Sequence, residues 1–252
     1  MIFLGHDIYW CNNCQYGFVY PAVSGKFLAN YYATSFRRNK KFNAVNLEIY
    51  KRRACAQYEF VMETLGGQIK TTDGTIVDIG CGVGAVVAHL TEMGYEAIGI
   101  EPDPVASDFG RENITPHIYS QLPALDNVQG IWLSHVAEHF IDIREELSKI
   151  LALPGLRFIF IEIPNYNIKS CQNKKNHASH LHFYTAESFI KALVLDIPLK
   201  ILAWNNFGPA WGEKLIHHTD KYAHSEIITR WDGYYGKQNP AGFWTRIVCA
   251  IK

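Results

Sequence analysis

The segment Ile76-Val-Asp-Ile-Gly-Cys-Gly-Val-Gly84 decides the fold that we expect for this chain. An apolar, β-type run around Asp78 leads into three glycines, and a helical pattern follows from about Ala85 to Met93. Glycines at 80 and 82 let the backbone turn sharply and approach a ligand, and a glycine at 84 permits close helix packing. The next helix begins with N–H groups that have no partner within the helix. The segment therefore predicts a strand, a turn and a helix in a geometry that binds an adenosine-type ligand.

Strand-like and helical patterns alternate from Thr75 onward, which is typical of a parallel sheet with helices on both faces. The predicted strands are 75–79, 97–100, 117–119, 130–133, 156–163, 199–203 and 246–251. The predicted helices are 44–65, 85–93, 104–112, 143–153 and 186–195. Between them, the polar stretch 164–179 predicts a surface loop. We expect an N-terminal layer over 1–70 and an α/β domain over 71–252, with an aromatic insertion at about 204–244.

An acidic residue follows the second predicted strand of the α/β domain. Glu101 lies 23 residues after Asp78, where a carboxylate suits a ribose with both hydroxyls free. The glycine spacing is Asp-x-Gly-x-Gly-x-Gly, whereas a nicotinamide fingerprint reads Gly-x-Gly-x-x-Gly. The spacing therefore weighs against a nicotinamide-dependent reductase.

Val77-Asp-Ile-Gly-Cys-Gly-Val-Gly84 resembles motif I of the class I S-adenosylmethionine-dependent methyltransferases, and the likeness extends over about 65–163. The resemblance implies a Rossmann-like sheet of seven strands, mostly parallel, with 246–251 as its antiparallel C-terminal strand. It also implies that S-adenosyl-L-methionine is the cofactor. Many relatives carry an acid in the loop on the adenine side, where this chain reads Tyr119-Ser-Gln-Leu-Pro123. The expected cofactor-binding residues are Asp78, Gly80, Cys81, Gly82, Gly84, Glu101, Pro102, Gln121 and Ser134.

Two histidine-containing segments point to one subgroup of this family. Leu133-Ser-His-Val-Ala-Glu-His-Phe140 follows the fourth predicted strand of the sheet, and His180-Leu-His-Phe-Tyr-Thr-Ala-Glu-Ser-Phe189 follows the fifth. Both resemble motifs of the subgroup that methylates small molecules, sugars and quinone precursors. A histidine that titrates near neutrality can remove a proton from an acceptor hydroxyl. The candidate catalytic residues are His139, His180 and Glu138.

These histidine and glutamate residues also allow other functional interpretations. His135, Glu138 and His139 provide three potential metal ligands within five residues, and His180 or His182 could add a fourth. This pattern is similar to that of metal-dependent O-methyltransferases, although we assign no residue as a metal ligand. Glu138 and His139 could instead cap the following helix. A non-catalytic scaffold that binds S-adenosylmethionine is a further alternative.

Cys11 and Cys14 form the one Cys-x-x-Cys pair of the chain. Their surroundings resemble the second half of the zinc ribbon that precedes some sugar-modifying methyltransferases. A structural zinc site normally needs four ligands, so we expect no zinc here. The aromatic segment 204–244 suits a lid or a stacking platform, or simple packing over the sheet.

The amino-acid composition restricts the classes of binding partner that we expect. The 24 Lys and Arg balance 24 Asp and Glu, and a pI near 7.2 weighs against nucleic acid as the acceptor. The sequence shows no membrane span and no secretory signal, which predicts a cytoplasmic protein. We expect methyl transfer to an oxygen or nitrogen atom of a small metabolite, with a carbohydrate or a surface-polysaccharide precursor as first choice. A homodimer is left open.

Overall fold

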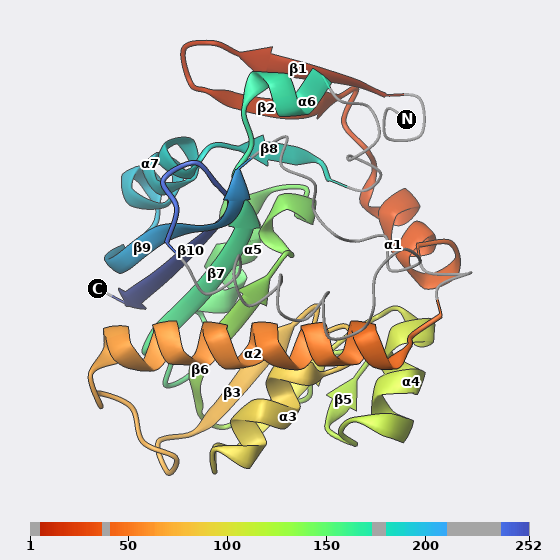
Figure 1. The fold of residues 1–252 in the computed structure, drawn as a ribbon, viewed down its shortest axis with the longest axis vertical. Coiled ribbons are helices and arrows are strands. Elements are labelled where there is room, and N and C mark those ends of the chain that lie inside the picture. The colour runs from red at the N-terminus through yellow and green to blue at the C-terminus, as the bar shows by residue number, and fades with distance from the viewer. Residues whose placement is uncertain (1–5, 37–40, 173–179, 211–237, 252) are drawn as a thin grey trace.

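The computed structural model describes residues 6–36, 41–172, 180–210 and 238–251, which form a large and a small β-sheet flanked by helices (Figure 1). The large sheet has the strand order β5-β4-β3-β6-β7-β10-β9. Its strands are β3 (Thr75–Ile79), β4 (Ala97–Ile100), β5 (Ile118–Tyr119), β6 (Val128–Ser134), β7 (Phe158–Pro164), β9 (Leu199–Ala210) and β10 (Gly242–Ile251). Strands β3 to β7 pair in parallel, while β10 is antiparallel to both β7 and β9. The predicted Rossmann-like fold class is confirmed.

The last two strands are longer than the sequence predicts. Strand β9 continues past 203 to Ala210, and β10 begins at Gly242 instead of 246, because the two strands pair with each other into the aromatic segment. Residues 211–237 of the expected insertion lie outside the described residues. The role of the insertion as a lid or platform therefore stays a prediction.

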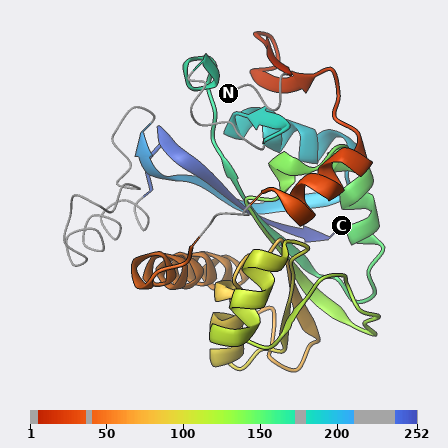
Figure 2. The same cartoon turned by 90° about the vertical axis from the view of Figure 1, so that its right-hand side faces the viewer.

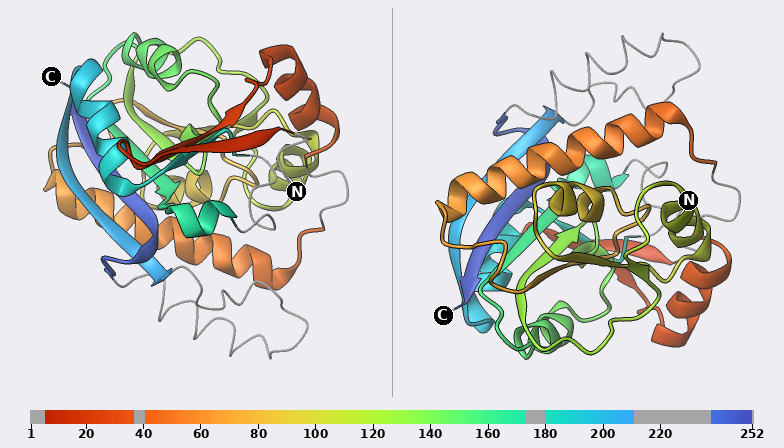
Figure 3. Two further views of the ribbon diagram at one scale, coloured as in Figure 1. Left: turned by 90° about the horizontal axis from the view of Figure 1, so that it is seen from above. Right: turned by 90° about the horizontal axis from the view of Figure 1, so that it is seen from below.

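All five predicted helices are present, with end points that differ by no more than a few residues. They are α2 (Ala44–Leu65), α3 (Ala85–Glu92), α4 (Pro104–Asn113), α5 (Ile143–Leu151) and α7 (Ala186–Asp196). Alternate residues of a strand pack against different helices, as buried strands require. In β7, Phe158 and Phe160 share a core with α2 and α3, whereas Ile159 and Ile161 share one with α5 and α7. Figure 3 shows α2 lying along the sheet beside α3.

Helix α2 packs against one face of the main sheet, and its buried side chains form part of the hydrophobic core there. Val61 and Leu65 are buried with Ile76 of β3, Leu90 of α3 and Phe160 of β7. The domain boundary expected near residue 70 stays a prediction, although this packing joins α2 to the sheet. Within the described residues, no helix combines the length and the hydrophobicity that a bilayer crossing requires.

The small sheet and two short helices are not predicted by the sequence pattern. Strands β1 (Asp7–Cys11) and β2 (Tyr16–Tyr20) form a hairpin, and β2 also pairs with β8 (His182–Tyr184). Helix α6 (Ile168–Gln172) lies in the stretch 164–179 for which the sequence predicts a surface loop, and α1 (Gly25–Thr34) follows the hairpin. Figures 1 and 2 show the small sheet and α1 on the side of the main sheet where the parallel strands end. These elements therefore face the edge at which open α/β sheets bind ligands.

Candidate active site

The backbone of the loop after β3 adopts a conformation that favours glycine. Gly80, Gly82 and Gly84 have φ values of 70°, 58° and 80°, in the left-handed region that other L-residues avoid. A Cβ atom at Gly80 would lie 2.5 Å from Cγ2 of Val136, and one at Gly84 would lie 2.7 Å from Cδ1 of Ile118. Both the conformation and the available space thus require these glycines.

Two buried carboxylates lie beside this glycine loop. Asp78, at 2% exposure, accepts no hydrogen bond from any residue that the structure describes. Burial, helped by the nearby charge of Glu101, raises the pKa of Asp78 well above its ordinary value. Glu101 accepts hydrogen bonds from the backbone N–H groups of Gly82 (2.9 Å) and Asp103 (3.0 Å). Glu101 therefore fixes the loop, whereas Asp78 is buried at the loop without an ion pair or hydrogen bond from a described residue.

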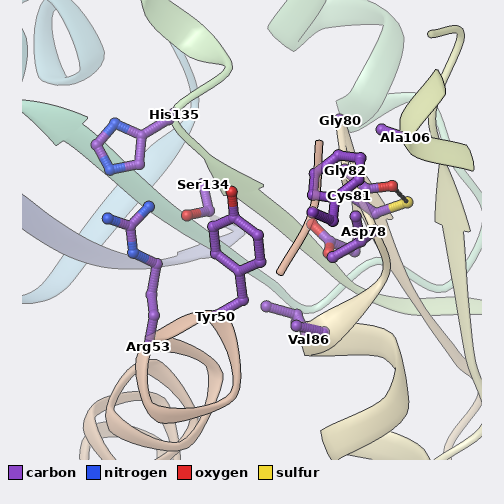
Figure 4. A pocket seen from close by; sticks show the side chains of 13 residues that line it. Tyr50, Arg53, Asp78, Gly80, Cys81, Gly82, Val86, Ala106, Ser134 and His135 are labelled. Atoms are coloured by element: carbon purple, nitrogen blue, oxygen red, sulfur yellow. Dashed lines mark hydrogen bonds between the residues drawn. The ribbon is translucent and has the colours of Figure 1, made fainter. Parts of the chain in front are cut away.

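Two pockets meet at the glycine loop and share Gly80 and His135. The first pocket is shown in Figure 4, and its walls include Tyr50, Arg53, Asp78, Cys81, Gly82 and Ser134. The second pocket is lined by residues that include Tyr32, Phe36, Glu101, Pro102, Ser120 and His139. A ligand that spans both pockets would lie across the loop backbone.

The structure does not bring every expected cofactor-binding residue to these pockets. Gln121 is exposed and lines neither pocket, whereas its neighbour Ser120 lines the second. Gly84 also lines neither, because it caps the start of α3 and faces Ile118 and Thr115. Its contribution is to the packing of α3.

A charged cluster follows β6. His135 has a φ of 59°, and its Nε2 lies 3.1 Å from Oε1 of Glu162, while its Nδ1 lies 3.4 Å from Oε1 of Glu138. Glu162 also accepts a 2.7 Å hydrogen bond from Nε of Arg246, and both side chains are almost fully buried. Burial would lower the pKa of His135, but the two carboxylates outweigh it and raise that pKa. His135 is therefore held as a bridge between two carboxylates.

Glu138, His139 and His180 converge beyond this bridge. Each offers one potential ligand atom, and these atoms lie within 4.8 Å of one another. Glu138 is 1% exposed, and neither carboxylate oxygen has a hydrogen-bond partner among the described residues. Burial would raise its pKa, but His135, His139 and His180 lower the pKa of Glu138 to about 2. Glu138 is therefore an ionised carboxylate surrounded by imidazole rings.

Each of the two candidate catalytic histidines contacts a tyrosine hydroxyl. Nδ1 of His139 lies 2.9 Å from the hydroxyl of Tyr32 in α1, and Nδ1 of His180 lies 2.5 Å from that of Tyr166. Nε2 of His180 lies 3.8 Å from Glu138. These contacts orient both rings. His139 lines the second pocket, whereas His180 lines neither of the two pockets.

Sequence reasoning missed Tyr32, Tyr166, Arg53 and Gln57, all of which contact or line this region. They lie outside the motifs, on elements that long-range packing brings to the edge of the sheet. Cys11 and Cys14 line neither pocket and lie at the turn of the hairpin, where the Cys14 N–H donates to Sγ of Cys11 over 3.3 Å. The expected absence of zinc there stays a prediction.

Comparison with known proteins places this site in a family. The model of a family described as "Methyltransferase domain" matches residues 47–194, more than half of the chain, and the chain belongs to this family. The match begins within α2 and includes the glycine loop, the β6 motif and His180. A search of curated proteins finds no match.

Solved structures of methyltransferases share the fold. Magnesium protoporphyrin IX methyltransferase from Synechocystis PCC 6803, solved with SAH (S-adenosylhomocysteine), is 12% identical, with 91% of this chain and 100% of that chain covered and a TM-score of 0.54. Geranyl diphosphate C-methyltransferase from Streptomyces coelicolor A3(2) is 17% identical, with 90% and 97% covered and a TM-score of 0.54. The plantazolicin methyltransferase BamL is 13% identical, with 88% and 94% covered and a TM-score of 0.56.

The family match and the fold together define the class of this protein. It is a class I methyltransferase, an enzyme that uses S-adenosylmethionine as its methyl donor. Identities this low show the fold and do not select an acceptor. As their names indicate, the three solved methyltransferases act on chemically unrelated molecules.

Proposed function

We propose that this enzyme methylates an oxygen or nitrogen atom of a small metabolite that enters the part of the second pocket lined by Tyr32, Phe36 and His139. The observation that carries the proposal is the Glu138–His139–His180 cluster, because His139 forms part of the wall of a pocket that also contains the glycine loop. When bound, S-adenosylmethionine supplies an electrophilic methyl group on a sulfonium. The acceptor atom must then be aligned with that methyl group and must lose a proton if it is a hydroxyl.

The cofactor fits the residues at the glycine loop. Asp78 is a buried carboxylate with no hydrogen bond to satisfy it within the described residues, which suits the ammonium group of a methionine chain. We assign Gly80, Cys81, Gly82 and Ser134 to the walls around that chain. We assign Glu101 and Pro102 to the ribose side and Ser120 to the adenine side, while a role for Gln121, which lines neither pocket, stays a prediction. Gly84 acts through the packing of α3.

The cluster supplies the acceptor chemistry. His139 is the first candidate for the base, because Tyr32 holds its Nδ1 and the ring lines the second pocket. His180 is the second candidate, and Glu138, whose Oε1 lies 3.8 Å from Nε2 of His180, orients a histidine or the acceptor. The aromatic rings of Tyr32 and Phe36 in the same pocket suit stacking on a sugar ring or another flat acceptor. A carbohydrate or polysaccharide precursor therefore remains the first choice.

The test combines binding with turnover. Calorimetric titration with S-adenosylhomocysteine would be followed by transfer of labelled methyl groups to a panel of sugar nucleotides and phosphorylated sugars. We expect His139→Ala or His180→Ala to lower the rate by on the order of 10² or more while S-adenosylhomocysteine affinity stays unchanged. His117→Ala, at an exposed histidine before β5, is the control. Equal rates in all three variants would exclude histidine base catalysis.

A metal-dependent form of the same reaction is favoured by one observation. The buried, ionised Glu138 lies with His139 and His180 in a mixed oxygen and nitrogen set that suits ions such as Mn²⁺, Fe²⁺ or Zn²⁺. Elemental analysis and titration of chelator-treated protein with Mn²⁺ and Zn²⁺ test this form. We expect stoichiometric binding that Glu138→Gln abolishes and activity that returns with metal. Full activity of metal-free protein in the presence of chelator would exclude the metal-dependent form.

The location of the enzyme and its partners stay predictions. The sequence favours a cytoplasmic protein, a small-molecule acceptor and no nucleic acid, and it leaves a homodimer open. Size-exclusion chromatography with light scattering would determine the oligomeric state.

A further inference from the structure

Two of the candidate catalytic residues, Glu138 and His139, lie on a turn that is too short to hold its own shape. This 3₁₀ turn, η2 (Ala137–His139), has no side-chain cap at its start among the described residues. Its last internal hydrogen bond, from the Phe140 N–H to the carbonyl oxygen of Ala137, is 3.4 Å long. Because 3₁₀ turns have poor hydrogen-bond geometry and short helices are marginal on their own, contacts from outside the turn are needed to fix it.

The segment around β8 supplies two such contacts. The Leu181 N–H, directly before β8, donates to the backbone carbonyl of Glu138 over 3.0 Å. Within β8, Nε2 of His182 lies 2.7 Å from the carbonyl oxygen of Phe140. Because a carbonyl oxygen can only accept a hydrogen bond, Nε2 of His182 is the donor. The two hydrogen bonds hold the backbone on either side of His139.

The N-terminal hairpin holds His182 in place. The hydroxyl of Tyr16 in β2 lies 2.5 Å from Nδ1 of His182, and the two rings stack with their centres 5.9 Å apart. Phe18 lies opposite His182 and Tyr16 lies opposite Tyr184, so these four side chains share one face of the small sheet. Figure 1 shows β8 between the hairpin and the main sheet. Neither Tyr16 nor His182 lines the two pockets, so both act on the acceptor site through the turn.

We propose that His182, held by Tyr16, is a positioning residue of the acceptor site that fixes the turn carrying Glu138 and His139. The proposal rests on the proposed function of this turn and deepens it, because it gives the N-terminal hairpin a part in catalysis. A displacement of about 1 Å between a base and a reacting atom can lower a rate by about 10²-fold. Loss of the hydrogen bond to Phe140 therefore lowers turnover more than cofactor affinity.

Amide hydrogen exchange followed by NMR tests the turn without any substrate. We expect His182→Leu, which removes the donor to Phe140, to speed exchange of the His139 and Phe140 amides roughly tenfold. His182→Gln should restore wild-type exchange, because its side-chain amide can donate to the same carbonyl. Tyr16→Phe should give a smaller increase, since its ring still stacks on His182. Unchanged exchange in His182→Leu would overturn the proposal.

Tyr9→Phe is the matched control for these variants. Tyr9 is a half-exposed tyrosine of the same sheet, and its ring contacts Phe18 and Tyr20 instead of His182. We expect Tyr9→Phe to show wild-type exchange at the turn. Thermal melts would establish that every variant folds.

Turnover of an acceptor that the wild type methylates connects the turn to catalysis. His182→Leu should lower kcat by roughly 10- to 100-fold while S-adenosylhomocysteine affinity stays unchanged, and His182→Gln should recover most of the rate. A loosened turn with an unchanged kcat would contradict the positioning role. If the wild type transfers methyl groups to no acceptor, the proposed function fails, and the exchange measurement still decides whether His182 holds the turn.

Discussion

At the scale of single residues, Asp78 illustrates how a binding group can weaken the protein that carries it. Its folded-state pKa is raised by burial and by Glu101, so the loss of its proton is less favourable in the folded than in the unfolded state. Stability is therefore highest below the unfolded pKa and decreases as pH rises toward the folded pKa. We expect Asp78→Asn to raise the melting temperature of ligand-free protein at neutral pH.

The same substitution should weaken S-adenosylhomocysteine binding. In the wild type, ligand affinity should increase as pH rises through the folded pKa of Asp78, because the ammonium group prefers the ionised carboxylate. The neighbouring groups are Glu101 at the loop, with Arg53 and His135 across the pocket. Calorimetry at several pH values would measure this. A variant that melts lower yet binds as tightly as wild type would contradict both expectations.

Glu162 shows the opposite balance, because its charge is paired. Burial would raise its pKa, but Arg246 and His135 lower it well below the ordinary value. Glu162→Gln would leave the buried Arg246 without its counter-charge, and we expect a loss of about 3–5 kcal/mol in the free energy of unfolding. Urea denaturation would measure the loss. Asp108→Asn, at an exposed pair with Arg111, should cost less than about 1 kcal/mol.

At the scale of elements, the start of α3 depends on Gly84. An alanine there would adopt an unfavourable φ and would also place its Cβ within 3 Å of Ile118 and Thr115 side-chain atoms. Gly66, which caps α2, has a positive φ but no atom within 4 Å of such a Cβ. We expect Gly66→Ala to cost about 1 kcal/mol and Gly84→Ala at least about 2 kcal/mol in chemical denaturation. Equal losses would show that space at Gly84 does not matter.

At the scale of the whole molecule, the N-terminal residues serve two different parts of the fold. Deleting 1–70 would remove α2 and expose the core that Val61 and Leu65 cover, so we expect a chain that does not fold. Deleting 1–40 would leave α2 intact but remove Tyr32 from His139. We expect that shorter deletion to fold and to bind S-adenosylhomocysteine while losing methyl transfer. Circular dichroism, thermal melts and calorimetry would test both chains, and a folded 71–252 chain would show that the predicted boundary is correct.

Much of the fold and part of the site could be read from the chain because they are encoded locally. The alternation of buried residues in β7, the helical spacing in α2 and the glycines at 80, 82 and 84 are properties of neighbouring residues. Those patterns determine the elements, their order and the parallel sheet. They also place the glycine loop and the histidine motifs at one edge, since parallel strands end on the same side.

The remaining features depend on contacts between residues far apart in sequence, which local periodicity does not encode. Pairing of β2 with β8 creates the small sheet, and packing of α1 brings Tyr32 to His139. Packing of α2 on the main sheet brings Arg53 to the first pocket across from Asp78. The sequence by itself thus specified the class of fold and the cofactor loop. Burial of apolar surface decided which polar side chains complete the site. Helix α2 packs on a face of the main sheet, and the hairpin and α1 pack against Tyr166 and β8, so each element brings its polar side chains to the place where its apolar residues are buried.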